Sequence, residues 1–181
     1  MTAEEFDTLV ERFPGSGTYE LLDGVFSEKI PPDLVTVELV GFLYACIWLH
    51  LRRSGSDGNV SSSYHGYEMG GEHLVPSLVY HAPGRPFNFY SDQLDPPDLA
   101  VEVVSDESNR TELDDLRAKL RHYRAAGVTV WVVLPRAQRA EVHEPDADPA
   151  QGPVTLGPDD ALQAPQLLPG FSLPLREIFS Q

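Results

Sequence analysis

The first twenty-six residues alternate between helical and strand-like spacing of apolar side chains. Residues 2–12 predict a helix with Thr2 as its N-cap, because apolar positions recur three and four residues apart after it. Residues 19–26 predict a β-hairpin, since Asp23 and Gly24 at its centre tolerate the positive φ angles of a type I′ turn. The chain therefore begins with a helix followed by two short strands.

A second helix is predicted from about residue 33 to residue 53. It leaves almost no polar side over its last three turns, and its apolar run from Leu39 to Leu51 falls short of the roughly 20 residues that span a bilayer. A helix that is apolar all round must be covered all round. We expect a central core helix, with a dimer interface as the alternative.

The clearest strand covers residues 98–104, where apolar side chains line both faces as in a central strand. A helix follows from about residue 113 and ends at Gly127, a natural C′ residue, and residues 128–134 predict a further interior strand. The three elements form a β-α-β unit, whose two strands should pair in parallel.

Length and composition indicate one domain, and the β-α-β pattern within it indicates the α/β class. The chain has 181 residues, of which 41% are hydrophobic, enough to bury a core, so we expect a single domain over residues 1–181. Residues 145–170 lack Lys and Arg and contain six prolines and four aspartates. That segment is predicted to be loop and edge material.

The charge and the cysteine content narrow the environment. A net charge of −15 repels polyanions and argues against non-specific nucleic-acid binding. The single cysteine, Cys46, excludes an internal disulfide and a CxxC site, and the N-terminal residues lack the basic and apolar regions of a secretory signal. We expect a cytoplasmic protein with no membrane partner.

Glu102 is the leading candidate for chemistry. It is the one ionisable residue in the middle of an apolar strand, and a buried charge costs several kcal/mol unless it is paired, protonated or bound to a cation. The alternative is a carboxylate satisfied by a buried arginine or by backbone donors. Asp98 lies on the same face about 13 Å away along the strand, so both cannot chelate one ion directly.

Lys119 is the second candidate, because only two lysines occur, Lys29 and Lys119. Lys119 projects on one flank of its helix and arginines project on the other. Taken alone, the favoured interpretation is a surface pair with Asp115 four residues earlier. The arginine flank is either a solvated face or a patch for a phosphate backbone. Its members are Arg110, Arg117, Arg121 and Arg124.

Five sequence blocks, taken in order, resemble the Uma-type family. These are bacterial proteins described as restriction endonucleases within the PD-(D/E)XK nuclease superfamily. The blocks are YELLDG at 19–24, PPDLAVEVVS at 96–105, DLRAKLRHYRAAGV at 115–128, VWVVLP at 130–135 and LPGFSLPL at 168–175.

The resemblance implies a restriction-endonuclease-like mixed sheet flanked by helices, a Mg²⁺-dependent centre that hydrolyses DNA phosphodiesters, and a homodimer. Glu102 matches the glutamate of the family's strand, and Lys119 matches the lysine of the following helix. The family's Val-Pro-Asp is Val-Pro-Ser here, with Ser77 at the acidic position. Val104 occupies the position two residues after the glutamate, where a lysine is usual. We expect Glu102 and Lys119 to face a common cleft, with Ser77 on the neighbouring strand.

Replacing a carboxylate by a hydroxyl removes a hard, charged ligand, so Mg²⁺ affinity should fall. Glu102 and Asp98 are the expected metal ligands, with Asp98 acting through a water, and Glu20 or Asp23 is an alternative compensating ligand. These possibilities describe a weakened nuclease. The other interpretation is a catalytically impaired protein that keeps the fold and acts as a homo-oligomeric binding or assembly module.

Overall fold

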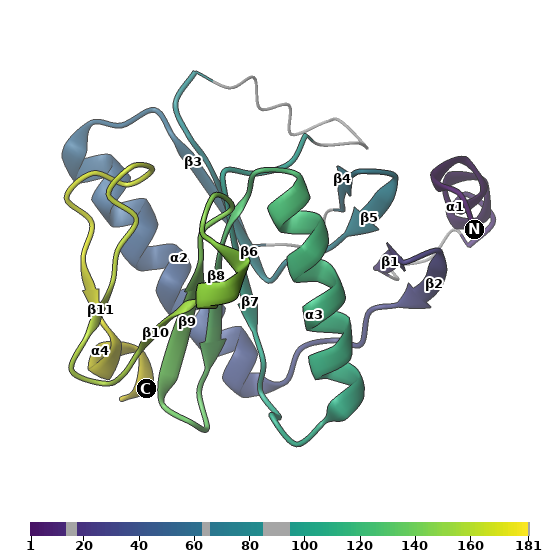
Figure 1. Cartoon of the computed structure of the whole chain (residues 1–181). Helices are drawn as coiled ribbons and strands as arrows, with labels where there is room; N and C mark the ends of the chain where they lie inside the picture. The colour runs from purple at the N-terminus through teal and green to yellow at the C-terminus, as the bar shows by residue number, and fades with distance from the viewer. Residues whose placement is uncertain (14–17, 63–65, 85–94, 181) are drawn as a thin grey trace.

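A computed structural model describes residues 1–13, 18–62, 66–84 and 95–180. Its centre is a six-stranded mixed sheet with helix α2 (Leu34–Ser54) against one face and helix α3 (Arg110–Ala125) against the other (Figure 1). The strands lie in the order β10 (Val154–Leu156), β9 (Arg139–His143), β8 (Thr129–Leu134), β7 (Leu99–Val103), β6 (Leu78–His81) and β3 (Asn59–Ser62).

The predicted β-α-β unit is confirmed at the middle of this sheet. Strands β7 and β8 pair in parallel, and α3 (Arg110–Ala125) connects them. Every residue of both strands is buried, as the apolar runs predict. Gly127 has φ +75° just past the helix, which is the left-handed conformation expected of a C′ glycine.

A second, antiparallel sheet holds the predicted N-terminal hairpin. Its order is β2 (Val25–Glu28), β1 (Tyr19–Leu22), β5 (Glu72–Leu74) and β4 (Tyr67–Met69). Asp23 and Gly24 have φ +50° and +75°, so the tight turn is confirmed. Helix α1 (Ala3–Val10) begins with the expected Thr2 cap, and only Phe6 of this helix is buried.

Helix α2 (Leu34–Ser54) corrects the expectation of a helix covered on all sides. Its buried residues form a single stripe at helical spacing, which packs on the sheet. The opposite side is apolar and exposed, because no other element among the described residues covers it. The buried residues are Thr36, Leu39, Leu43, Ile47 and Leu51. The exposed large apolar residues are Leu34, Val35, Val37, Trp48 and Leu49.

The same helix, at 21 residues, is long and apolar enough to cross a membrane by length and composition. The apolar stretch predicted from the sequence, Leu39 to Leu51, was too short, because apolar residues continue before Leu39. The buried stripe of α2 packs on the six-stranded sheet, and 22% of its apolar window is buried.

The C-terminal segment closes the α2 side of the core. Strand β10 is an edge strand of the main sheet, and β11 (Ala161–Leu162) pairs with β12 (Leu173–Pro174) before α4 (Leu175–Phe179). The 3-10 helix η1 (Pro149–Gln151) precedes β10. Between these short elements the segment is irregular.

We predict that the two sides of α2 respond differently to truncation. Leu43→Ala removes a fully buried side chain and should lower the free energy of unfolding by about 3 kcal/mol. Leu49→Ala, on the exposed side, should cost less than about 1 kcal/mol. Urea unfolding at low protein concentration measures both, and equal losses would contradict one-sided burial.

Candidate active site

Glu102 faces α3 from the middle of the main sheet. Its strand neighbours Val101 and Val103 belong to the core on the α2 side, whereas Ala100 and Val104 belong to the core on the α3 side. Alternation along β7 therefore turns Glu102 toward α3, where it is 6% exposed.

Helix α3 presents two polar partners to this acid. Tyr123 donates its hydroxyl proton to Glu102 Oε1 at 2.7 Å, and Lys119 Nζ lies 3.6 Å from the same oxygen. The two residues are four positions apart and so lie on one face of the helix. Lys119 is 6% exposed, which rules out the alternative of a solvent-exposed pair with Asp115.

Glu20 on β1 completes a buried pair of carboxylates around one ammonium. Lys119 Nζ lies 2.6 Å from Glu20 Oε1, and the backbone N–H of Val75 donates to the same oxygen at 2.7 Å. Both glutamates thus lie within 3.6 Å of Lys119 Nζ. Of the two hairpin acids named as compensating ligands, Glu20 is the one brought to this site.

Lys29 was not singled out from the sequence, yet it lies beside this cluster. Its ammonium donates to the backbone carbonyl of Val75, whose N–H binds Glu20. Both lysines of the chain therefore meet at one site. Lysine is rare in this chain, and that rarity could have pointed to Lys29 as well as to Lys119. We call Glu20, Lys29, Glu102, Lys119 and Tyr123 the buried charge cluster.

The electrostatics of the cluster follow from burial and proximity. Burial alone would lower the pKa of Lys119, but Glu102 and Glu20 outweigh it and hold that pKa above its ordinary value. Burial, followed by the nearby ammonium of Lys119, lowers the pKa of Lys29. Burial and the charge of Glu102 raise the pKa of Tyr123 well above its usual value, so its hydroxyl stays a donor.

Ser77 lies next to Glu102, but just before the neighbouring strand and not on it. It directly precedes β6, and its backbone N–H donates to the Val101 carbonyl at 2.9 Å. The register pairs Leu78 with Val101, so one further step places Ser77 opposite Glu102. The Ser77 hydroxyl accepts a long hydrogen bond of 3.4 Å from the Val103 N–H.

Asp98 is engaged at the other end of β7. Its Oδ2 accepts a hydrogen bond of 2.7 Å from the backbone N–H of Ala82. Its backbone also joins both neighbouring strands, since its N–H donates to Tyr80 and its carbonyl accepts from Thr129. Asp98 thus helps to hold the sheet together, away from the Glu102 end of the strand.

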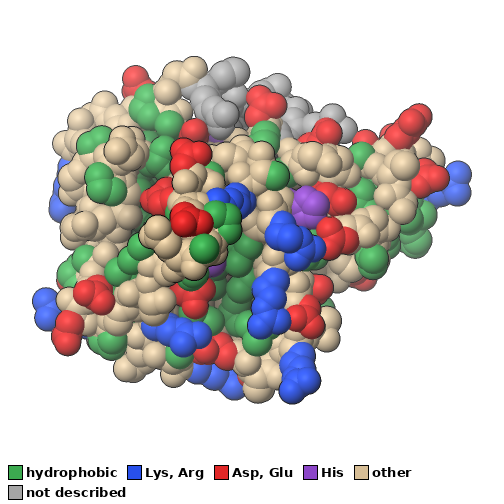
Figure 2. Space-filling view, in the orientation of Figure 1, with side chains coloured by type: hydrophobic (Ala, Val, Ile, Leu, Met, Phe, Trp, Pro, Cys, Tyr) green, Lys and Arg blue, Asp and Glu red, His purple; other side chains and the backbone are tan. Residues whose placement is uncertain are grey.

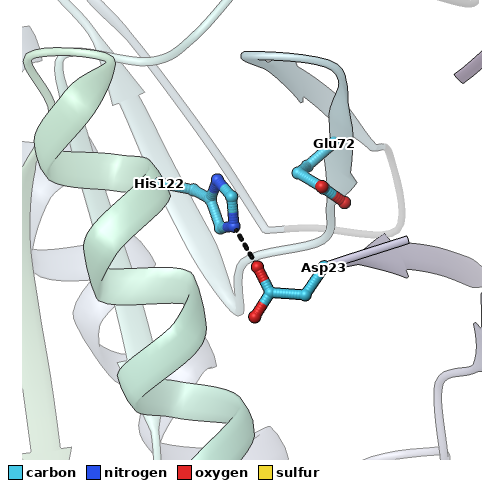
Figure 3. Close-up of side chains that lie close together, drawn as sticks. All are labelled: Asp23, Glu72 and His122. Carbon is cyan, nitrogen blue, oxygen red and sulfur yellow. Dashed lines mark hydrogen bonds and ion pairs between the residues drawn. The ribbon is translucent and has the colours of Figure 1, made fainter. Parts of the chain in front are cut away.

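Asp23 lies in a separate, more exposed cluster (Figure 3). Its Oδ1 lies 2.9 Å from His122 Nε2, and one ligand atom each of Asp23, Glu72 and His122 lie within 4.8 Å of one another. The Arg121 guanidinium already contacts its Oδ2 at 2.7 Å. The hydrogen bond with His122 and the charge of Arg121 lower the pKa of Asp23 despite some desolvation. Asp23 therefore makes its contacts outside the buried charge cluster.

The donor set of the buried charge cluster fits a hard divalent cation in type. Two carboxylates converge, and a hydroxyl lies beside one of them. The lysine between the carboxylates already neutralises them in part, so the residues fit a weakly held ion better than a tight one. Glu20 and Glu102 would hold it.

We predict that Tyr123→Phe weakens the fold at neutral pH. Glu102 would lose a buried donor, at a cost of about 1–3 kcal/mol in the free energy of unfolding. The pKa of Tyr123 is raised in the folded protein, so its contribution to the free energy of unfolding is complete below about pH 10, the ordinary pKa of tyrosine. That contribution is lost as the pH rises from there toward the pKa of Tyr123 in the folded protein. The difference from wild type should therefore narrow above pH 10.

Urea unfolding at several pH values measures this difference, with Tyr44→Phe on α2 as a partly buried control. A difference that widens in alkali would contradict the assignment.

The comparisons with known proteins concern the fold and the family of the chain. A crystal structure described as a putative nuclease belonging to DUF820 from Anabaena variabilis is similar over 99% of this chain and 98% of that one, with TM-score 0.77 and 20% identity. This likeness confirms the predicted fold class. The comparison with curated proteins found no match. The family model described as "Uma2: Putative restriction endonuclease" matches residues 3–176. The chain belongs to the Uma2 family.

Proposed function

We propose that the protein is a weakened, divalent-metal-dependent DNA endonuclease that hydrolyses phosphodiester bonds at the buried charge cluster. The observation that carries this proposal is the convergence of Glu20 and Glu102 on Lys119. Two carboxylates and one lysine from three separate elements are the groups that such hydrolysis requires. Membership in a restriction endonuclease family supports the same reaction class.

Mg²⁺ is the proposed ion, and Glu102 and Glu20 are its proposed protein ligands. When bound, such an ion neutralises phosphate charge and lowers the pKa of a water. The chain's own groups supply the rest. Tyr123 orients Glu102 through its hydroxyl, and the Val75 N–H orients Glu20. Lys119, held protonated, offers a positive charge to an incoming phosphate.

Ser77 accounts for the proposed weakness. It lies opposite Glu102, where a carboxylate would add a negative charge and a hard ligand. The Asp98 carboxylate accepts a hydrogen bond from the Ala82 N–H at the far end of β7, so it is a poorer substitute for that carboxylate than Glu20 is. We retain Asp98 only as a ligand acting through a water.

The arginine flank of α3 is the proposed DNA contact. Figure 2 shows basic side chains along the face that α3 presents, with acidic side chains beside them. Arg110, Arg117, Arg121 and Arg124 are all exposed. They supply local positive charge on a molecule whose net charge of −15 repels DNA.

A catalytically impaired binding module is the second candidate. The specific observation in its favour is that Lys119 already satisfies both glutamates, with Ser77 in the place of a further acid. A buried ion-pair cluster of this kind can persist for structural reasons alone. A homodimer and a cytoplasmic location remain proposals under both candidates.

We predict that wild-type protein nicks supercoiled plasmid slowly with Mg²⁺ and that Glu102→Gln abolishes nicking. Ser77→Asp should tighten Mg²⁺ binding at least about tenfold in calorimetry, because it adds a charged oxygen ligand opposite Glu102. Glu68→Gln, an exposed change on β4, is the control and should leave nicking unchanged.

The outcomes separate the two candidates. If wild type neither binds Mg²⁺ nor nicks, while Ser77→Asp does both, the impaired candidate is correct. If Glu102→Gln nicks as fast as wild type, the buried charge cluster is not the active centre, provided that its far-ultraviolet circular dichroism shows a folded protein.

We also predict that Arg117→Gln together with Arg124→Gln weakens binding to duplex DNA. Each lost phosphate contact should lower the slope of log affinity against log salt by about 0.9. Fluorescence anisotropy of labelled DNA across a salt series measures the slope. Arg176→Gln, on α4, is the matched control. An unchanged slope in the α3 variant would remove the arginine flank from the DNA contact.

A further inference from the structure

The exposed side of α2 is apolar along most of its length. Projected at 100° per residue, its surface centres on Ala45, directly opposite the buried stripe. Leu34 is 73% exposed, and Trp48 and Leu49 are 43% and 40% exposed. Ten large hydrophobic residues are exposed in the described part of the chain, and five of them lie on this helix. A contiguous surface of this kind marks an interaction site.

Opposite charges bracket this surface. Glu38 lies near its N-terminal end and Arg52 near its C-terminal end, both exposed, and the side between them carries no charge. The Arg52 guanidinium lies 5.3 Å from the centroid of the Trp48 ring, so it stays on the same side of the helix. The surface is therefore acidic at one end, neutral in the middle and basic at the other.

We propose that this side of α2 docks against the same side of α2 from a second copy, antiparallel about a twofold axis at Ala45. Glu38 and Arg52 are each seven residues from Ala45. The symmetry therefore places Glu38 of each copy opposite Arg52 of the other, at both ends of the interface. A parallel pair would instead oppose like charges.

The middle of the surface fits close approach of two helices. Gly41 and Ala45 are small and exposed, and a Cβ added at Gly41 meets no atom within 4 Å. In the antiparallel arrangement Leu49 lies opposite Gly41 of the other copy, so the large side chain of one helix fills the gap of the other. The surface is thus self-complementary in shape as well as in charge.

Charge also favours a second copy over a lipid surface. An amphipathic helix that lies on a membrane is typically rich in Lys and Arg along its polar side. Here the exposed side carries one acid, Glu38, near one end and two bases, Arg52 and Arg53, near the other, on a protein of net charge −15 that anionic lipid repels. One helix face is smaller than a standard interface of about 800 Å² per partner, so we expect a micromolar dimer.

Sedimentation velocity of the full chain across a dilution series tests the dimer. We expect a reversible monomer–dimer equilibrium that Trp48→Glu abolishes. Glu38→Arg and Arg52→Glu should each weaken association about tenfold, because each creates two like-charge pairs. The double variant should recover to within about threefold of wild type, since it exchanges the charges.

Cross-linking tests the axis. In a Cys46→Ala background, Ala45→Cys should form an intermolecular disulfide under mild oxidation, because a residue on the axis meets its own copy. Leu34→Cys is the control on the same side, and it should not cross-link, since the antiparallel arrangement separates its two copies by about 33 Å along the helices. Efficient cross-linking of both would indicate parallel helices and overturn the proposal.

Three further results would overturn it: a monomer at every concentration, single charge reversals that leave association unchanged, or a double variant that stays as weak as the singles. Flotation with phosphatidylcholine vesicles covers the alternative occupant. Vesicle binding by a chain that never dimerises, lost in Trp48→Glu, would assign the surface to lipid instead.

Discussion

The ammonium of Lys119 holds two buried carboxylates together, and the arrangement around the site depends on that contact. Glu102 comes from the main sheet and Glu20 from the second sheet, so Lys119 of α3 joins the two sheets at one point. Removing one partner would leave an uncompensated buried charge, which is far costlier than losing a surface pair. The pair of acids can converge only because the lysine offsets their repulsion.

The β-α-β unit explains why these groups meet. Strand β7 turns alternate side chains toward α3, and α3 turns residues four apart toward the sheet. Glu102 and the Lys119–Tyr123 pair therefore face each other as a consequence of two ordinary periodicities. Glu20 requires more, because the hairpin must dock its sheet beside α3, and its carboxylate then binds the backbone N–H of Val75.

Much of this could be predicted from the sequence. The strand around Glu102, the following helix and the parallel strand after it can each be recognised from local patterns. Together they turn Glu102 and Lys119 toward each other. Lys29 could not be placed, because its contact with Val75 spans 46 residues and no periodicity encodes it. The prediction that α2 is covered on all sides was also wrong. An apolar pattern shows which side chains avoid water, but it does not show which partner covers them.

The exposed apolar side of α2 is more than the packing of this helix on the sheet requires. A helix packed on a sheet needs only one apolar stripe, and charged residues on its other side would favour a soluble monomer. The exposed side of α2 instead keeps Trp48 and Leu49 at a cost in solubility, with Glu38 and Arg52 confined to its ends. The proposed docking gives this side an apolar partner, and the antiparallel symmetry of Glu38 and Arg52 adds charge complementarity between the two copies.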